Sequence, residues 1–567
     1  MTHNISRRRA LQTGAAATAV AAAAASAQSI ASAGPAEEFP TDHAVFQHGV
    51  ASGDPYSDSV LLWTRVTSHP EDYAGRNRGV DTTVRWEVAT DEAFGNVVSS
   101  GTIRVTPDTD MTAKPEAVGL QPYTGYFYRF SVQDGPYKGQ ISPVGRTRTA
   151  PAPGQDMSEL RFALFSCSNW EAGFFNAYRD MAQRGDVDYA LCVGDYIYEY
   201  PAGEYTGKTG SLRNHLPANE IVSLADYRER YAQYHTDPDL QAAHGACPWI
   251  VTWDDHEVAN DTWSGGAENH QPGDGNFIER RDAAIQAYLE WLPIRATPFS
   301  EGGHIYRNLS FGSLAELNML DLRTYRNEQV SFTSMGKTDD TSRTMMGSEQ
   351  FTWLAGKLQS SQARWNLIGN SVMITPILIP PLKQPEADAV TQLLGLPKQG
   401  IPYNFDQWDG YAAERRRIVK LMQENDIHNS VWLTGDIHSS WACDVPVEPG
   451  NYPAKGVAGV EIVTPSVTSS NIDDILKLPE DNPLSQTVES AFTNLNRYVK
   501  YLDMDSHGYA VVQVTPDYVH TDWIFMNPDG KFHPGAPLHY AKSARAYQGQ
   551  GIRMSNQPLD VNAHSAR

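Results

Sequence analysis

The sequence predicts an α/β domain preceded by a small all-β domain of immunoglobulin-like type. In residues 84–88 and 126–132, apolar and polar side chains alternate with the period of two that is typical of half-buried strands. Turn residues such as Gly53-Asp54-Pro55 separate these runs, and several short strands within about 100 residues favour a sandwich. After a Pro-rich linker at 150–154, short apolar runs alternate with helical segments, which indicates an α/β domain.

These changes in pattern predict the domain limits. We expect the β domain at 40–150, the α/β domain at 155–533 and a tail at 534–567, which is rich in Gly, Pro, Ser and Gln and predicts a surface wrap or partial disorder. Within the β domain, Leu120–Tyr126 resembles the entry to a fibronectin-like strand, where a tyrosine pins the corner. In the larger domain, Ser223 and Asp226 are placed to cap a helix over 224–235.

The N-terminal residues 1–33 have the pattern of a secretory signal. Arginines at 7–9 precede an Ala-rich stretch without charges, which ends in Ala31-Ser32-Ala33. The paired arginines resemble a twin-arginine signal, so we expect export by that machinery to the cell envelope or the medium. The alternative is a membrane anchor, but Thr, Ser, Gln and Gly interrupt the stretch, and a spanning helix needs about 20 predominantly apolar residues.

The composition excludes some classes of partner. The 567-residue chain has a formal net charge of −22, which argues against nucleic acid and against adhesion to anionic membranes. It contains 41% hydrophobic residues, enough for a large core. Four cysteines in so long a chain are no disulfide scaffold, so some of them are expected to be free thiols.

Four apolar runs that we interpret as buried strands end in residues suited to binding metal. They lead into Ser166-Cys167-Ser168-Asn169, Gly194-Asp195-Tyr196-Ile197-Tyr198-Glu199, Asp254-Asp255-His256-Glu257 with Asn260 and Asp261 after it, and Gly435-Asp436-Ile437-His438. Ligands bind outside the carboxyl ends of strands in open α/β sheets. The mixture of soft and hard donors suits a mixed metal site.

Each of these residues also has a purely structural interpretation. Cys192 is best explained as a packed thiol, Asp254 and Asp255 are placed to cap a following helix, and Tyr198 and His256 fit a core. Four strand ends of the same character make coincidence a poor explanation. The four strings together therefore favour a metal site more strongly than any one of their residues does.

The four strings, in this order and behind a sandwich that contains Leu61–Val66, resemble the alkaline phosphatase D family. The resemblance extends to residues 320–326 and 369–372 and covers nearly the whole chain after the signal. It implies a metallophosphoesterase-type β-sandwich flanked by helices. It also implies a secreted iron- and calcium-dependent hydrolase of phosphate mono- and diesters.

The resemblance also implies the role of individual residues. Cys167, Asp195, Tyr198 and His438 are expected to bind Fe(III), with Asp195 bridging to calcium. Asp255 and Asp436 would supply oxygen atoms to the second metal, with Asn260 as an additional oxygen donor. His256 would act at the leaving group, and Arg323 and Asn370 would lie near the site.

The implied chemistry is attack on phosphorus by a metal-bound hydroxide. His256 would protonate or orient the leaving oxygen. Ser168 and Ser439 are alternative nucleophiles, but the sequence pairs neither with a base. No phosphorylated enzyme is therefore required.

The sequence is compatible with two other functions. A phospholipase D would use the same site on phospholipids, with the apolar loop 393–409 meeting the lipid, although a loop packed over the domain is the simpler interpretation. A surface-binding protein with a degenerate site is the non-enzymatic alternative. The intact set of expected ligands argues against degeneracy. Small phosphate esters or phospholipid headgroups are thus the expected partners.

Overall fold

The protein is described by a computed structural model that covers residues 45–564, apart from 69–71, 73, 77, 297–298, 300–301, 384–390 and 392–395. The signal predicted at 1–33 therefore lies outside the described residues, as do Leu393 and Leu394 of the apolar loop.

A large sheet runs through the molecule and carries three of the four predicted strand ends. Its central strands β9, β10 and β11 are parallel, with Ala163 beside Ala190 and Ala190 beside Trp249. The strand order is β24 (Gly551–Ser555), β23 (Leu538–Tyr547), β22 (Val519–Met526), β21 (Gly508–Val514), β9 (Leu160–Phe165), β10 (Tyr189–Cys192), β11 (Trp249–Val251), β1 (Val50–Gly53), β2 (Ser59–Arg65) and β5 (Thr112–Ala113), with β6 (Glu116–Val118) also on β2.

A second sheet faces the first and carries the fourth strand end. Its order is β12 (Arg307–Phe311), β13 (Ala315–Met319), β14 (Trp365–Asn370), β17 (Ser430–Thr434), β19 (Val457–Val463), β18 (Ser440–Pro446) and β20 (Val499–Asp503). Phe162 and Leu164 of β9 point into the core between the sheets and pack in one cluster with Leu367 and Leu433. The strands β15 (Leu378–Ile379) and β16 (Ile401–Pro402) form a separate pair.

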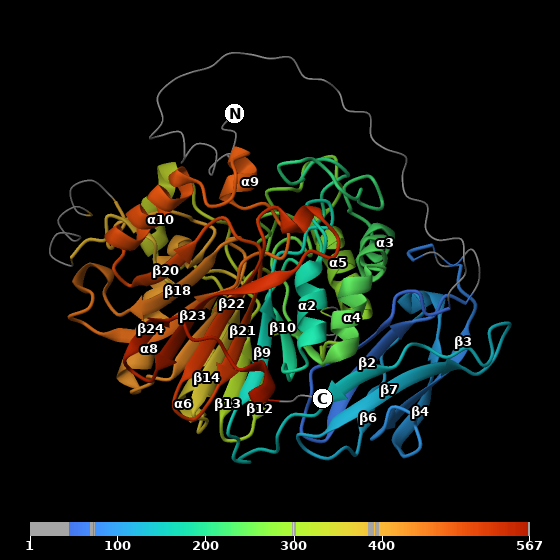
Figure 1. The fold of residues 1–567 in the computed structure, drawn as a ribbon. Helices are drawn as coiled ribbons and strands as arrows, with labels where there is room; N and C mark the ends of the chain where they lie inside the picture. The colour runs from blue at the N-terminus through green and yellow to red at the C-terminus, as the bar shows by residue number, and fades with distance from the viewer. Residues whose placement is uncertain are drawn as a thin grey trace.

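Helices cover the outer faces of both sheets (Figure 1). The large sheet packs against α2 (Asn176–Arg184), α3 (Leu224–His235), α4 (Pro238–Ala246) and α5 (Phe277–Trp291), whereas α6 (Gly347–Ser360) and α8 (Ala412–Glu424) cover the second sheet. The helices α9 (Ile472–Leu476) and α10 (Pro483–Leu495) precede β20. Short 3-10 helices lie at Pro107–Thr109, Phe332–Asp339, Trp408–Tyr411, Pro449–Asn451, Gly530–Phe532 and Val561–Ala563. The predicted sandwich flanked by helices is confirmed.

The predicted β domain is also present. Its separate sheet has the order β4 (Val97–Val105), β3 (Thr82–Ala89), β7 (Gly125–Val132), β8 (Gly145–Arg148). Side chains of β3 and β7, among them Val84 and Tyr128, pack in one cluster with Val60 and Leu62 of β2. The hydroxyl of Tyr126 accepts a hydrogen bond of 2.8 Å from the backbone N–H of Gln121, which confirms the predicted tyrosine corner.

The two parts of the molecule are joined through a shared sheet. Gly53 of β1 pairs with Trp249 of β11 in a parallel register. Beside this pair, Asp54 accepts hydrogen bonds of 2.6 Å from the guanidinium of Arg307 and from the backbone of Arg295. A buried ion pair thus ties the end of β1 to the α/β domain.

The C-terminal segment corrects the predicted tail. Residues 538–555 form β23 and β24, which extend the large sheet through antiparallel pairing with β22. Ala544, Ala546 and Ile552 are buried in the core between the two sheets. The Gly- and Ser-rich composition of the segment does not have the apolar pattern that predicts strands. Small inward-facing side chains are sufficient to pack this edge of the sheet against the core.

The helix predicted over 224–235 is confirmed, with Ser223 and Asp226 forming a reciprocal capping box. All four cysteines are buried free thiols. Among the described residues, no helix has the length and apolar character needed to cross a membrane.

Candidate metal centre

The predicted ligands meet at the carboxyl ends of β9, β10, β11 and β17. Cys167 follows β9, Asp195 follows β10, Asp255 follows β11, and Asp436 follows β17. The two sheets face each other through a common core, so the ends of these strands lie together.

The backbone turns sharply at several of these positions. Cys167, Asp195, Asp436 and His438 have φ values of 62°, 56°, 65° and 53°. Non-glycine residues seldom adopt this left-handed region, and such strain concentrates at functional sites. These turns direct the four side chains into one place.

Four side chains form the first ligand group. One ligand atom each from Cys167, Asp195 and His438 lie within 4.8 Å of one another. The hydroxyl of Tyr198 is 3.1 Å from Asp195 Oδ2 and 3.4 Å from His438 Nε2. The sequence-based set of Cys167, Asp195, Tyr198 and His438 is therefore brought together, and thiolate, phenolate, imidazole and carboxylate suit iron.

The pKa values of these side chains indicate that the group suits a bound cation. Burial, followed by the charge of Asp195, raises the pKa of the Cys167 thiol and of the Tyr198 phenol well above their ordinary values. Burial also raises the pKa of Asp195, and its Oδ1 accepts no hydrogen bond from the described residues. A cation among these donors would stabilise their anionic forms and bind that oxygen, so the residues fit a metal ion.

Asp195 also belongs to a second group, with Asp255 and His256. Asp255 in turn forms a group with Asp254 and Asp436. One carboxylate shared between adjacent groups is the arrangement expected of a residue that bridges two metals. Asp255 and Asp436 thus lie where the sequence predicted a second, oxygen-rich site.

Arg323 lies among these carboxylates. The family resemblance implied only that this residue would lie near the site. Its guanidinium contacts Asp254 in a bidentate pair at 2.5 and 2.7 Å, and it lies 3.0 Å from Asp406 and 3.1 Å from Asp436. Burial disfavours the charged guanidinium, but Asp254, Asp255 and Asp406 outweigh the effect and hold the pKa of Arg323 well above its usual value. Arg323 therefore neutralises part of the negative charge of the oxygen-rich site.

His256 lies beside the first group and is held by a residue that was not predicted. Its Nδ1 is 2.7 Å from Oε2 of Glu199, and its ring lies 4.2 Å from that of Tyr198 between centroids. Burial opposes a charge on His256, yet Glu199, Asp255 and Asp195 together hold its pKa well above the ordinary value. These carboxylates therefore favour the protonated form of His256.

Three further predictions have mixed outcomes. Asn260 lies next to the centre. Its backbone N–H donates a hydrogen bond of 2.7 Å to Glu199, and its side-chain amide donates one of 3.0 Å to Glu268. Its role as a metal ligand stays a prediction. Asn370 instead donates to the backbone of Val372 and to Thr434. The helix that Asp254 was expected to cap is absent, because residues 254–261 form turns.

The alternative nucleophiles are engaged elsewhere. Ser168 Oγ lies 2.6 Å from the hydroxyl of Tyr178, and Ser439 Oγ donates to the carbonyl of Ile437. Neither contacts a base in the described structure. The buried Cys192 packs in the core behind the large sheet, as predicted.

Residues 162–523 match the PhoD-like phosphatase family, and residues 29–151 match the N-terminal domain of the same family. The chain belongs to the PhoD-like phosphatase family. It is 38% identical over 487 residues to alkaline phosphatase D of Bacillus subtilis. The aligned residues cover 85% of this chain and 77% of that protein.

Solved structures agree with this assignment. The structure of PhoD superposes with a TM-score of 0.79 at 34% identity, over 92% of this chain and 94% of the other. A purple acid phosphatase from yellow lupin shares the fold, with a TM-score of 0.51 at 13% identity over 88% of this chain and 74% of that one. The chain is thus a phosphoric ester hydrolase, and the non-enzymatic alternative is set aside.

Proposed function

We propose that this enzyme hydrolyses phosphate mono- and diesters at a centre that holds Fe(III) and Ca²⁺. The observation that carries the proposal is the convergence of Cys167, Asp195, Tyr198 and His438 in one group, of which only His438 is partly exposed. Thiolate and phenolate together favour a ferric ion, and the carboxylates of Asp255 and Asp436 favour calcium. Bound metals of this kind would supply Lewis acidity to water and to the phosphoryl oxygens.

The residues of the chain account for the remaining steps. Asp195 belongs to both ligand groups and fixes their separation. Glu199 fixes the orientation of His256 and favours its protonated form, so His256 is placed to donate a proton to the departing alkoxide oxygen. Arg323 limits the repulsion among the carboxylates, which otherwise disfavours an anionic substrate.

The substrate class is tested by a paired assay on one metal-replete sample. Iron and calcium are measured per chain, and hydrolysis of a monoester, a diester and phosphatidylcholine is compared, with Asp195→Asn as the matched inactive control. We expect the two small esters to be cleaved fastest, with iron and calcium both bound. Dominant release of choline would instead establish the phospholipase alternative.

We also propose that the enzyme acts outside the cytoplasm after twin-arginine export. The support is the pattern of residues 1–33, with Arg7 and Arg8 ahead of the Ala-rich stretch. Replacing both arginines by lysine keeps the charge and removes the signal that the receptor reads. The expected result is unprocessed precursor inside the cell, and normal processing would contradict it.

A further inference from the structure

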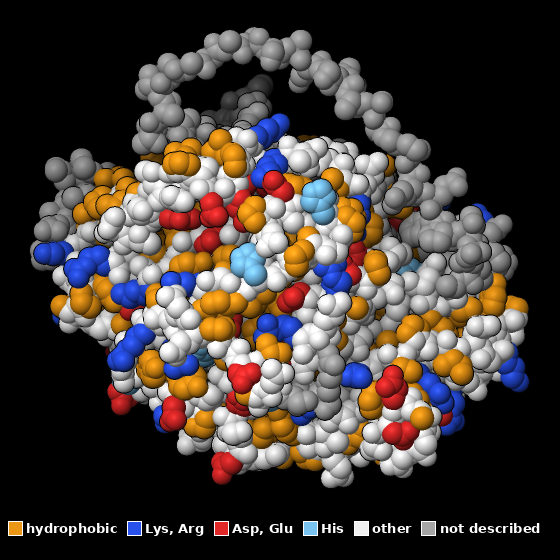
Figure 2. Space-filling view, viewed as in Figure 1, with side chains coloured by type: hydrophobic (Ala, Val, Ile, Leu, Met, Phe, Trp, Pro, Cys, Tyr) orange, Lys and Arg blue, Asp and Glu red, His pale blue; other side chains and the backbone are white. Residues whose placement is uncertain are grey.

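A second concentration of acidic side chains, outside the ligand groups described above, lies in a hollow beneath α10 (Figure 2). It is built by α9, the loop between α9 and α10, α10 itself and the residues that follow β20. We call it the acidic hollow and define it by Asp473, Glu480, Asp481, Glu489, Asp503 and Asp505. The phosphatase reaction makes no use of these groups.

Two carboxylate oxygens in the acidic hollow are buried without a hydrogen bond. Asp473 and Asp505 are 2% and 3% exposed. Lys208 donates to Asp473 Oδ2 at 3.0 Å, and the backbone of Asp481 donates to Asp505 Oδ2 at 3.1 Å. The Oδ1 atoms of both aspartates accept no hydrogen bond from the described residues. A buried carboxylate oxygen without a partner costs free energy unless a cation binds it.

Negative charges predominate among the described side chains around these oxygens. Burial, followed by the repulsion of Asp473 and Asp503, raises the pKa of Glu480 to about 8, although Lys208 opposes the shift. Burial and neighbouring carboxylates also raise the pKa of Glu489 and of Asp505 to about 7. In the part of the chain that the structure describes, the charges that act most strongly on Glu489 and Asp505 are thus other carboxylates.

The neighbouring group of Asp473, Asp474 and His507 is a weaker candidate. Asp474 is already in contact with the ammonium of Lys531 and lies 3.2 Å from His507 Nε2. Burial raises the pKa of Asp474, but Lys531 and His507 outweigh this effect and hold it below the ordinary value. Asp474 is therefore satisfied by protein cations, whereas Asp505 is not.

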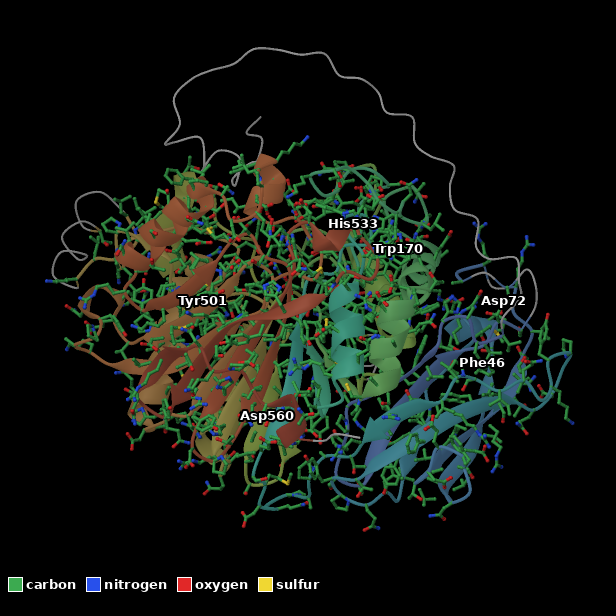
Figure 3. The ribbon with its side chains drawn as sticks, in the orientation of Figure 1. Phe46, Asp72, Trp170, Tyr501, His533 and Asp560 are labelled. Carbon is green, nitrogen blue, oxygen red and sulfur yellow. The ribbon has the colours of Figure 1, made fainter. Side chains whose placement is uncertain are left out.

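We infer that the acidic hollow binds a divalent cation, separate from the metal centre, through the buried oxygens of Asp473 and Asp505. Its donors are carboxylates, with the hydroxyl of Ser485 beside Asp505, and this all-oxygen set in irregular loops suits calcium. Tyr501 of β20, labelled in Figure 3, hydrogen-bonds Asp503.

The position of the hollow gives the cation a structural role. It would link the loop at 480–482 to the residues after β20, and Asn471, which caps α9, already bonds the carbonyl of Asp505. Just upstream, the carbonyl of Ser470 lies 2.8 Å from His438 Nδ1, and Ser469 donates to Tyr198 at 2.6 Å. Calcium in the acidic hollow would thus stabilise the segment behind two of the predicted iron ligands.

The test counts calcium on the full-length protein. The double variant Glu480→Gln/Asp505→Asn removes two charges from the hollow. Glu424→Gln/Asp426→Asn is a matched control on exposed acids of 63% and 94% side-chain exposure. After equilibrium dialysis against calcium chloride, we expect one calcium ion fewer per chain in the hollow variant than in the control. Equal stoichiometry would overturn the inference.

Thermal melting gives an independent readout that does not depend on the metal centre. Without calcium and at about pH 9, above the pKa values of Glu480 and Asp505, the hollow variant should melt no lower than the wild type, because two repelling charges are gone. Added calcium should raise the Tm of the wild type, of the matched control and of Asp195→Asn, but should raise that of the hollow variant less. An equal calcium-induced shift in the hollow variant and its control would also overturn the inference, whatever the activity.

Discussion

Glu199 and His256 form a buried hydrogen-bonded ion pair, with Nδ1 of the histidine 2.7 Å from Oε2 of the glutamate. The other glutamate oxygen accepts hydrogen bonds from the backbone of Asn260 and from the amide of Asn269, at 2.7 and 2.8 Å. Burial alone raises the pKa of Glu199, but His256 and these donors lower it below the ordinary value. The pair therefore fixes both the orientation and the proton of the imidazole.

Glu199→Gln should lower kcat about tenfold or more, because a general acid contributes about 10²–10⁴-fold and this one loses its anchor. The glutamine also removes the negative charge that holds the pKa of His256 high. His256 then deprotonates at lower pH, so the alkaline limb of the kcat profile should move to lower pH. Glu204→Gln, an exposed glutamate in the next loop, is the control. An unchanged profile in Glu199→Gln would remove Glu199 from the mechanism as a positioning residue.

Cys167→Ser should abolish tight iron binding, whereas Cys192→Ser should retain it. Both thiols are buried at the ends of neighbouring parallel strands, so the two substitutions disturb the packing to a similar degree. Only Cys167 lies within the ligand group of Asp195 and His438. Iron content per chain is the measurement, with the visible absorption of ferric phenolate as a second signal from Tyr198. Full iron content in Cys167→Ser would place the iron elsewhere.

The candidate ligands at the strand ends could be found from sequence because each follows an apolar strand. The parallel strands β9, β10 and β11 put Cys167, Asp195 and Asp255 at one edge of a sheet, and this placement depends only on local pattern. The residues that tune the ligands could not be predicted in this way. Glu199 meets His256 across 57 positions, and Arg323 meets Asp406 across 83. Such pairs depend on how loops fold back, which no local periodicity encodes.

Arg323→Gln should destabilise the protein by about 3–5 kcal/mol, the usual cost of removing one partner from a buried ion pair. Asp254, Asp406 and Asp436 would then repel each other without the guanidinium. The free energy of unfolding is measured in urea without added calcium. Arg553→Gln, on an exposed part of β24, serves as the control.

Calcium should restore part of the stability that Arg323→Gln loses, because a divalent cation then neutralises the same carboxylates. Arg323→Lys should be intermediate, since it keeps the charge but loses the bidentate contact with Asp254. A loss in Arg323→Gln no larger than in Arg553→Gln would show that the carboxylates do not need this cation.

Three histidines buried behind the large sheet should make the protein labile to acid. Burial lowers the pKa of His48 and His244 well below the ordinary value and that of His235 to about 3. His235 and His244 both lie within hydrogen-bond distance of the Tyr196 hydroxyl, at 3.1 and 2.8 Å, and remain neutral in the fold. The unfolded chain binds protons at these histidines near pH 6.5, whereas the folded chain does not.

The sign of the effect follows from this difference. Above about pH 6.5 these histidines are neutral in both states and stability does not depend on them. Below that pH, each contributes a loss of up to about 1.4 kcal/mol per pH unit, which for His235 continues down to its folded pKa. Unfolding in urea between pH 8 and 5 should therefore give a shallower decline for His235→Gln than for His428→Gln, an exposed control. Because both variants keep the same metal ligands, equal slopes would show that His235 is not the source of the acid lability.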